Sequence, residues 1–275
     1  MKLVIYHFSD LHYSIEKRKD IEIIIRSLVF DINNFKEYFK DYKKIVIFAG
    51  DLFLNGENNN DENSFILDDF VTKILSSTGI SENEFFIVPG NHDVNRNKIT
   101  DTYEKGLYEK YKDNNSLNNL YDNPGFDFDI IKMRMTNYSD FRELMSSQSL
   151  IKSNLFYNSY KLDLPDNLSI GIIEFNNAWI DSGLRPNENN ILLPEHAITD
   201  SLIDLKDTNI KIAISHFPLE MHSQFNYNSL YPYLIKHFDF YFTGHLHDSD
   251  FDYSQKLLGK LYHFKSAYLY NKKSK

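Results

Sequence analysis

Carboxylate, amide and imidazole side chains gather in five short clusters along the chain. The clusters lie in the sequences SDLH, GDLF, GNHD, SHFP and GHLH, and their metal-ligand residue types are Asp10, His12, Asp51, Asn91, His92, Asp93, His216, His245 and His247. Oxygen and nitrogen donors of this kind bind divalent transition metals in proteins. The chain has no cysteine, so a bound metal would have to be held without thiolates. Together, the five clusters predict a metal centre.

Each cluster follows a short apolar run that predicts a buried β-strand. The runs are LVIYHF, KIVIFAG, EFFIVPG, IKIAIS and FDFYFTG. Near-continuous apolar runs are typical of strands buried on both faces, so we expect the polar clusters at the carboxyl edge of a sheet. Asp10 and His12 are two residues apart, and in extended backbone both side chains would point to the same side and reach one ion.

Two segments between the first three runs have the spacing of amphipathic helices. The first contains Ile21, Ile24, Ile25, Leu28, Ile32, Phe35 and Phe39, and the second contains Phe65, Leu67, Phe70, Ile74 and Leu75. A helix between two strands predicts a β-helix-β crossover. Because such crossovers are right-handed, they should place the first three strand ends side by side.

The segment from about residue 99 to residue 158 differs in composition from the rest of the chain. It is rich in Asn, Asp, Tyr and Lys, and it contains the turn sequence Asn123-Pro124-Gly125. A helix is predicted near residues 130–145. We therefore expect this segment to be an inserted, mostly helical cap.

A β-hairpin is expected directly after the cap. The sequence YKLDLPDNLSIGIIEF places Pro165, Asp166 and Asn167 between two apolar stretches, and these residue types favour a turn. The chain shows no internal repeat. We expect a single domain of residues 1–270 that carries the cap, and residues 271–275 as a short basic tail.

Composition and charge restrict the class of protein. Of the 275 residues, 42% are hydrophobic and 25% are charged, which is ordinary for a soluble globular protein. A net charge of -9 repels polyanions, so duplex DNA is not favoured as a partner. No apolar run approaches the ~18 residues of a membrane span, and the N-terminus lacks the apolar stretch of a signal peptide. We expect a cytoplasmic protein that does not enter membranes.

Taken in order, the five clusters resemble the signature blocks of the calcineurin-like metallophosphoesterases. The resemblance runs from residue 9 to residue 247, and no ligand position is substituted. It implies an α/β fold of two packed mixed β-sheets flanked by helices, with the metals at the carboxyl ends of the strands. It also implies that Asp10, His12 and His247 hold one metal, that Asn91, His216 and His245 hold the other, and that Asp51 bridges both.

The same resemblance implies a chemistry for these residues. Two divalent ions share a hydroxide that attacks the phosphate ester, and the donor set suits Mn, Fe, Zn or Ni better than Mg. His92 resembles the residue that stabilises the transition state or protonates the leaving oxygen, and Asp93 would orient its ring and favour its charged form. Asn91 and Arg96 are candidates for substrate contacts. For Arg96 the alternative is a surface salt bridge.

Several histidines lie outside the five clusters. His196, His222, His237 and His263 match no block, so structural or surface roles are favoured for them. His222 follows His216 closely enough in the chain to reach the edge of the site. His7 falls within the first apolar run and is expected to pack in the core.

The motifs favour a phosphodiesterase over a protein phosphatase. GDLF lacks the Asp-Arg-Gly that follows the second block of protein Ser/Thr phosphatases, and GNHD stands where those enzymes have GNHE. The blocks look more like those of bacterial phosphodiesterases, so a nucleotide or another phosphodiester is the expected substrate. Two alternatives stay open. One is a nuclease acting on DNA or RNA, which is not favoured because no Lys/Arg-rich groove segment is found, and the other is a non-catalytic interaction scaffold. The sequence names no protein partner.

Overall fold

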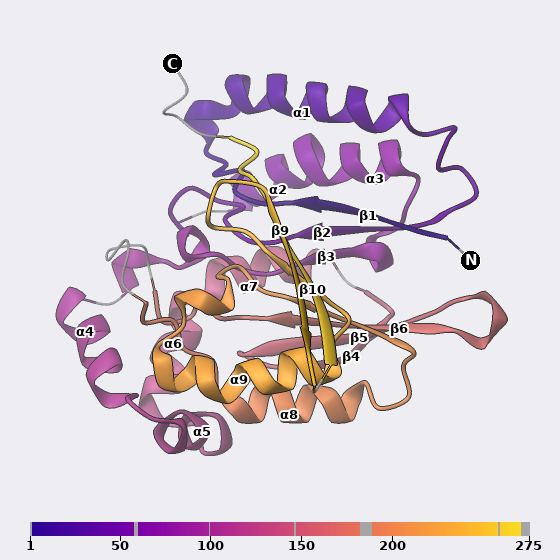
Figure 1. The fold of residues 1–275 in the computed structure, drawn as a ribbon. Coiled ribbons are helices and arrows are strands. Elements are labelled where there is room, and N and C mark those ends of the chain that lie inside the picture. The colour runs from indigo at the N-terminus through magenta and orange to yellow at the C-terminus, as the bar shows by residue number, and fades with distance from the viewer. Residues whose placement is uncertain are drawn as a thin grey trace.

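Two β-sheets pack face to face, and helices cover the outer side of each (Figure 1). The computed structural model describes residues 2–57, 60–98, 100–145, 147–181, 189–257 and 259–270. The predicted α/β fold with two sheets between helical layers is confirmed. Both sheets were expected to be mixed, but the first is parallel throughout and only the second combines parallel and antiparallel pairs. The predicted tail of residues 271–275 lies outside the described residues.

The three-stranded sheet contains the first three predicted strands. They are β1 (Leu3–Phe8), β2 (Lys43–Phe48) and β3 (Phe85–Ile87), in the order β1-β2-β3. The crossovers are α1 (Arg18–Asn34) and a stretch of α2 (Asn60–Ile66), the π-helical turn η2 (Leu67–Val71) and α3 (Thr72–Thr78). The three strand ends lie side by side, as predicted. The first helix is shorter than expected, since Phe35 is its C-cap and is 56% exposed.

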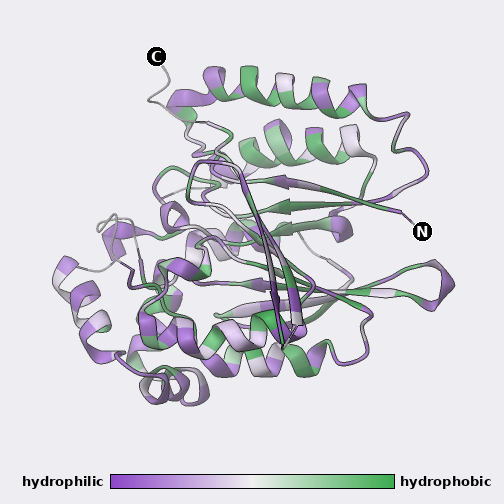
Figure 2. Cartoon of the chain, in the orientation of Figure 1, coloured by the Kyte–Doolittle hydropathy of each residue, from purple (hydrophilic) through white to green (hydrophobic). Residues whose placement is uncertain are grey.

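Strand β2 shows why these runs are almost entirely apolar. Val46 and Phe48 belong to the core beneath α1 and α3, whereas Ile45 and Ile47 belong to the core between the two sheets. Successive side chains of a strand point to opposite faces, so a strand between two apolar layers needs apolar residues at every position. Figure 2 shows hydrophobic stretches along the strands of this sheet, with hydrophilic residues on the outer side of the helices.

The seven-stranded sheet contains the other predicted strands and three that were not predicted. Its order is β4-β5-β6-β7-β8-β10-β9, with β4 (Leu150–Ser153), β5 (Tyr157–Asp163), β6 (Ser169–Phe175), β7 (Ile210–Ile214), β8 (Phe240–Thr243), β9 (Asp250–Lys256) and β10 (Gly259–Lys265). The predicted hairpin is formed by β5 and β6, whose turn contains η6 (Pro165–Asn167). Helices α8 (Glu195–Asp204) and α9 (Gln224–His237) pack on the outer face. The hairpin of β9 and β10 was missed, because most residues of its outer strand are exposed and the strand has no apolar run.

The segment predicted as a helical cap contains four helices and then returns to the sheet. The helices are α4 (Asp101–Lys110), α5 (Asn114–Asp122), α6 (Phe126–Arg134) and α7 (Thr136–Glu143). Two of them begin at side-chain N-caps, where Thr100 and Asp113 accept backbone N–H groups at 3.2 and 2.8 Å. In Figure 1 helices α4 to α6 lie at one end of the layers. Beyond Glu143 the chain forms β4 and β5, so the helical part ends before residue 158.

A buried carboxylate joins the two sheets close to the end of β3. Glu174 on β6 is 2% exposed, and its Oε1 accepts the N–H of Ile87 on β3 at 2.7 Å. Its Oε2 accepts the hydroxyl of Tyr160 at 2.8 Å, and the guanidinium of Arg142 on α7 lies 3.4 Å from Oε1. The network holds β3, and with it the loop that follows, against the larger sheet.

The remaining helices are single turns. They are η1 (Ile15–Lys17), η3 (Glu82–Glu84), η4 (Asn91–Asp93), η5 (Arg96–Lys98) and η7 (Leu219–Met221). Among the described residues, no helix combines the length and the apolar character needed to cross a lipid bilayer. The cytoplasmic location stays a prediction.

Candidate metal centre

The loops after β1, β2, β3, β7 and β8 meet at the carboxyl edge shared by the two sheets. Backbone hydrogen bonds connect neighbouring loops: Asp10 N–H donates to Gly50 O at 3.0 Å, and Gly244 N–H donates to His216 O at 3.0 Å. The structure thus brings together the seven residues predicted to hold metal, and their side chains gather in one cluster.

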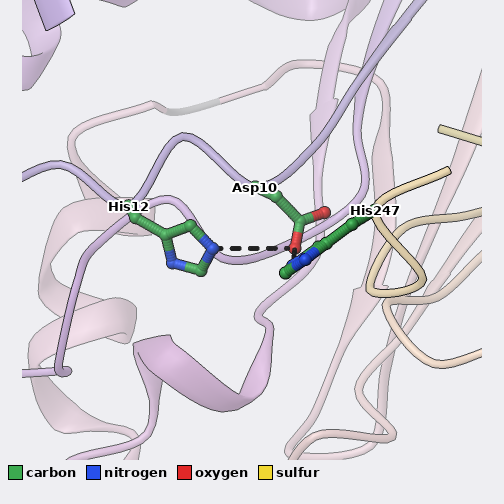
Figure 3. Close-up of side chains that lie close together, drawn as sticks. All are labelled: Asp10, His12 and His247. Carbon is green, nitrogen blue, oxygen red and sulfur yellow. Dashed lines mark ion pairs between the residues drawn. The ribbon is translucent and has the colours of Figure 1, made fainter. Parts of the chain in front are cut away.

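One part of the cluster is formed by Asp10, His12 and His247 (Figure 3). Asp10 Oδ1 lies 3.2 Å from His247 Nε2 and 3.8 Å from His12 Nε2. The Asp10 side chain is fully buried, whereas the side chain of His247 is 44% exposed. Asp10 Oδ1 has no hydrogen-bond partner among the described residues. A buried carboxylate oxygen with imidazole nitrogens around it and no donor of its own is suited to a cation.

Asp51 connects this part of the cluster to a second one. Its Oδ2 lies 3.4 Å from His216 Nε2 and 3.9 Å from His12 Nε2. His216 Nε2 in turn lies 3.2 Å from Asn91 Oδ1 and 3.2 Å from His245 Nδ1. The second part therefore contains Asn91, His216 and His245, and Asp51 stands between the two groups.

Most of the predicted ligands adopt a backbone conformation that residues other than glycine rarely take. Positive φ angles are found at Asp10 (58°), His12 (48°), Asp51 (57°), His245 (68°) and His247 (63°), and otherwise among non-glycine described residues only at Asp166 and Asn167 in the hairpin turn. The extended backbone expected at Asp10 and His12 is therefore wrong. Left-handed conformations cost free energy and cluster at functional sites, where the surrounding structure holds them in place.

Two glycines of the motifs are required by close packing. A Cβ at Gly90 would lie 2.1 Å from Asp51 Oδ1, and a Cβ at Gly50 would lie 2.5 Å from His216 Nδ1. Gly50 also has a φ of 91°. The glycine before Asp51 and the glycine before Asn91 therefore let three ligand-bearing loops approach each other.

The electrostatics favour positive charge in the cluster. Burial opposes ionisation of Asp51, but the surrounding imidazoles, His216 first, hold the pKa of its carboxyl well below the usual value. Burial lowers the pKa of His216, but Asp51 and Asp10 outweigh this and raise it to about 9. His245 is different, since burial lowers its pKa to about 4 and keeps the imidazole neutral, the form that binds metals.

The His92 ring is held at the border of the cluster by a backbone carbonyl. Its Nδ1 lies 2.6 Å from Leu54 O, so Nδ1 donates to this carbonyl and Nε2 is the ring nitrogen left for other contacts. The ring centroid is 4.5 Å from that of His12, and the His92 N–H donates to Asp51 Oδ1 at 2.8 Å. His92 is therefore close to the cluster through both its ring and its backbone.

Asp93 does not have the contact that was expected for it. No hydrogen bond or ion pair between Asp93 and the His92 ring is found in the described part of the chain. Instead its carboxylate accepts backbone N–H groups of Gly90 at 2.8 Å, Phe53 at 2.8 Å and Leu52 at 3.3 Å. Asp93 therefore fixes the loops that carry Asp51 and Asn91, and the expected role in orienting the ring is wrong.

Arg96 lies beside His92. Its Nη2 is 3.5 Å from His92 Nδ1, but both atoms carry protons, so this approach is a contact and not a hydrogen bond. Its Nε is buried without a partner, and no ion pair to Arg96 is found among the described residues. The surface salt bridge proposed as its alternative role is not observed there.

Asn177 is a structural contributor that the motifs did not reveal. Its Nδ2 donates to Phe217 O at 2.8 Å and its Oδ1 accepts Phe217 N–H at 3.2 Å, which fixes the loop after His216. His222, for which a structural or surface role was favoured over a place at the edge of the site, is buried and hydrogen-bonded to Asn177 and Asn226. The signal was available, because Asn177 follows the apolar run of β6 as the ligands follow theirs.

Comparison with known proteins gives matches over most of the chain. The family model described as calcineurin-like phosphoesterase matches residues 3–249. The "uncharacterized metallophosphoesterase-like protein YydB" of Bacillus subtilis (strain 168) is 23% identical over 260 residues, which cover 92% of this chain and 50% of that protein. The chain thus spans about half the length of this relative.

Two solved structures are similar over 98% of the chain. One is titled "Termus thermophilus Sulfate thiohydrolase SoxB in complex with glycerol", with a TM-score of 0.47, 10% identity and 52% of that chain covered. The other is the 5'-nucleotidase from Candida albicans SC5314, with a TM-score of 0.42, 13% identity and 46% of that chain covered.

Proposed function

Because the chain belongs to the calcineurin-like phosphoesterase family, we propose that it hydrolyses a phosphate ester, preferably a phosphodiester, at two divalent metal ions. The observation that carries the proposal is the position of Asp51. Its carboxylate lies between the imidazoles of His12 and His216, within 3.9 Å of each. A carboxylate within reach of two groups of ligands can join two ions, an arrangement that a single-metal site does not need.

The donor set fits two divalent ions. Asp10, His12 and His247 would hold one ion, Asn91, His216 and His245 the other, and Asp51 both. Asp10 Oδ1 supports this assignment, because it is buried without a hydrogen bond from a described residue and has the imidazoles of His247 and His12 beside it. Imidazole nitrogen combined with carboxylate and amide oxygen suits Mn, Fe, Zn or Ni better than Mg. When bound, such ions polarise phosphate oxygens and lower the pKa of water.

His92 and Arg96 are the proposed contacts to the reacting phosphate. The bond from His92 Nδ1 to Leu54 O fixes the ring, so Nε2 is the atom that would meet the leaving oxygen and hold or transfer its proton. The guanidinium of Arg96 follows in the next turn and would pair with phosphate oxygens. Asp93 is a positioning residue, because its carboxylate accepts backbone N–H groups of the loops that carry Asp51 and Asn91.

The cap is the proposed source of substrate selection. Helices α6 and α7 touch the loops of the centre, because Asn95 N–H donates to Arg134 O at 3.0 Å and Asn137 Nδ2 donates to Gly56 O at 2.9 Å. A substrate above the metal ions would therefore lie near these helices. We propose that they form the cap of a single domain of residues 1–270.

The proposal is tested on protein stripped with a chelator. Adding Mn, Ni, Zn or Fe should restore hydrolysis of bis-p-nitrophenyl phosphate, and Asp51→Asn should abolish it together with one or both bound ions. His92→Ala should lower kcat by about 10²- to 10⁴-fold at unchanged metal content, as expected when a proton-transfer group is lost. His237→Ala, on α9, serves as the control and should be unaffected.

Three results would change the assignment. Two bound ions without turnover of any ester would favour the scaffold alternative. Faster cleavage of oligonucleotides than of small diesters would favour the nuclease. Absence of stoichiometric metal binding would overturn the proposal.

A further inference from the structure

A second group of metal-ligand side chains lies outside the candidate metal centre. Glu220 on η7, Asp252 on β9 and His263 on β10 each offer one donor atom, and these atoms all lie within 4.8 Å of one another. His263 Nδ1 is 4.0 Å from Glu220 Oε1. None of the three residues belongs to the five motifs, and the proposed hydrolysis does not use them.

The His263 ring is fixed in an orientation suited to binding a ligand. Its side chain is 8% exposed, and its ring stacks on Tyr241 with centroids 4.6 Å apart. Its Nε2 lies 2.9 Å from Thr243 Oγ1, whereas Nδ1 has no hydrogen bond to any described residue. A histidine whose one nitrogen is hydrogen-bonded and whose other nitrogen is free is the arrangement found in protein metal sites. Burial lowers the pKa of His263 to about 4, so the ring is neutral near pH 7.

The charges around this ring leave an excess of negative charge. Lys265 Nζ lies 2.6 Å from Asp252 Oδ2 and 3.7 Å from Asp250 Oδ2. Glu220, Asp250 and Asp252 contribute three negative charges and Lys265 one positive charge, so the group has a net charge of -2. The ammonium therefore neutralises only part of the cluster, and a divalent cation would neutralise the rest.

The three donors open into a cavity with room for an ion and its water. The cavity has a volume of about 260 Å³ and is lined by Glu220, Asp252 and His263 together with tyrosines and leucines of α9, β8 and β10. Glu220 and Asp252 are 57% and 51% exposed, whereas the imidazole is buried and fixed. Asp252 Oδ2 is held by Lys265, so its contact to an ion would be made in place of this ion pair or through Oδ1. Coordination of zinc at distances of about 2.0–2.2 Å would need these two carboxylates to move toward the fixed imidazole.

We propose that Glu220, Asp252 and His263 form a third divalent-metal site, separate from the catalytic pair and structural in role. One imidazole nitrogen and two carboxylate oxygens, with water as a fourth ligand, suit Zn²⁺ or a neighbouring transition ion. The site does not depend on the proposed hydrolysis.

The proposed third site lies next to the chain segments that follow two loops of the candidate metal centre. Glu220 follows the loop of His216, and Asp252 follows the loop of His245 and His247. Thr243, which contacts His263, immediately precedes Gly244 and His245. An ion bound here would tie together the two segments that leave the candidate metal centre, and it would stabilise the hairpin of β9 and β10.

The test compares zinc content after chelator treatment and equilibrium dialysis against Zn²⁺. Glu220→Gln and Asp252→Asn should each bind one equivalent less than the unmodified protein, or bind it at least about 10-fold more weakly. Asp250→Asn is the matched control, since it removes the same charge from the same cluster but no proposed ligand. Glu220 is exposed, so its variant should fold. Saturation with Zn²⁺ should raise the melting temperature of the Asp250→Asn protein more than that of the Glu220→Gln protein.

Two outcomes would overturn the proposal. Zinc content and affinity equal in Glu220→Gln, Asp252→Asn and the unmodified protein would show that these side chains bind no ion. An equal loss in Asp250→Asn would show that the cluster attracts cations by its charge and does not coordinate one. The difference between variants is independent of how many ions the catalytic residues hold, so failure here leaves the proposed phosphoesterase activity untouched.

Discussion

Polar residues in the cap helices and in the candidate metal centre are used in opposite ways. In the cap, the Asp127 carboxylate accepts hydrogen bonds from Tyr103 at 2.5 Å, Lys110 at 2.6 Å and Tyr111 at 2.6 Å. In the centre, Asp10 Oδ1 is buried without a hydrogen bond from any described residue, and the imidazoles of His247 and His12 lie 3.2 and 3.8 Å from it. Both side chains are aspartates in polar surroundings. The comparison shows that the residue type alone does not identify a functional site. A buried carboxylate oxygen that accepts no hydrogen bond from the protein is the more informative signal.

The two regions also differ in backbone conformation. Helices α4 and α5 begin at Thr100 and Asp113, whose side chains satisfy the first N–H groups in the manner typical of helix N-caps. The loops of the centre instead place aspartate and histidine at positive φ. Such a conformation persists only where other contacts fix it, and here Asp93 and the close-packed glycines supply them.

The largest expected effect is a loss of stability when a buried ion pair of the cap is removed. Arg134 and Glu104 form an ion pair in which the side chains are 0% and 3% exposed. Glu104→Gln leaves a buried guanidinium without its counter-charge, so it should lower the free energy of unfolding by about 3–5 kcal/mol. Urea denaturation measures this change. Asp101→Asn, in an exposed pair on the same helix, is the control and should change it by less than about 1 kcal/mol. Equal effects of the two variants would mean that the cap tolerates the buried charge.

The next largest effect is a loss of metal affinity when the close packing between Gly90 and Asp51 is disturbed. Gly90→Ala places a Cβ 2.1 Å from Asp51 Oδ1, so Asp51 must move. We expect metal affinity to fall about 10- to 100-fold, with a loss of stability of about 1–3 kcal/mol. Isothermal titration with Mn²⁺ measures the affinity. Gly106→Ala is the control, because no atom lies within 4 Å of the added Cβ. Alanine favours the helical conformation of α4, so this variant should be more stable by about 0.5–1 kcal/mol and should keep its metal affinity. Unchanged affinity in Gly90→Ala would show that Asp51 is not held by this packing.

The smallest effect is a pH dependence confined to the cap. Burial opposes ionisation of Asp127, but the Lys110 ammonium and the two tyrosine hydroxyls outweigh it and hold its pKa below the usual value of 3.8. The folded state therefore binds this proton less readily than the unfolded state does. The stabilisation is fully present above the unfolded pKa, and it is lost as the pH falls through the folded pKa. Asp127→Asn should be less stable than the unmodified protein at pH 7 by about 1 kcal/mol, and this gap should narrow below pH ~4. Thermal melts across this range measure it, and a constant gap would contradict the assignment.

Fold prediction succeeded where apolar residues form uninterrupted runs. Val46, Ile47 and Phe48 identify β2 because both of its faces are buried. It failed at β9, where Phe251 and Tyr253 are exposed and alternate with acidic residues, so the strand depends on its pairing with β10. Phe35 was placed in a helix by its spacing alone, whereas the chain turns there and exposes the ring.

The sequence by itself determined which residues gather at the site. Asp10, His12, Asp51, Asn91, His216, His245 and His247 each follow an apolar strand, and parallel strands bring their carboxyl ends to one edge. Within each sheet this needs only strand direction and crossover handedness, which local sequence and chirality fix. The two edges meet because the sheets pack face to face.

Only the tertiary structure decided the contacts of each side chain. The hold of Asp93 on the N–H groups of Leu52 and Phe53 and the approach of His263 to Glu220 join segments far apart in the chain, and contacts of this kind hold the predicted ligands at positive φ. Such contacts depend on how the two sheets and their helices pack. No short stretch of sequence contains that information, because the partner of each group lies in another element.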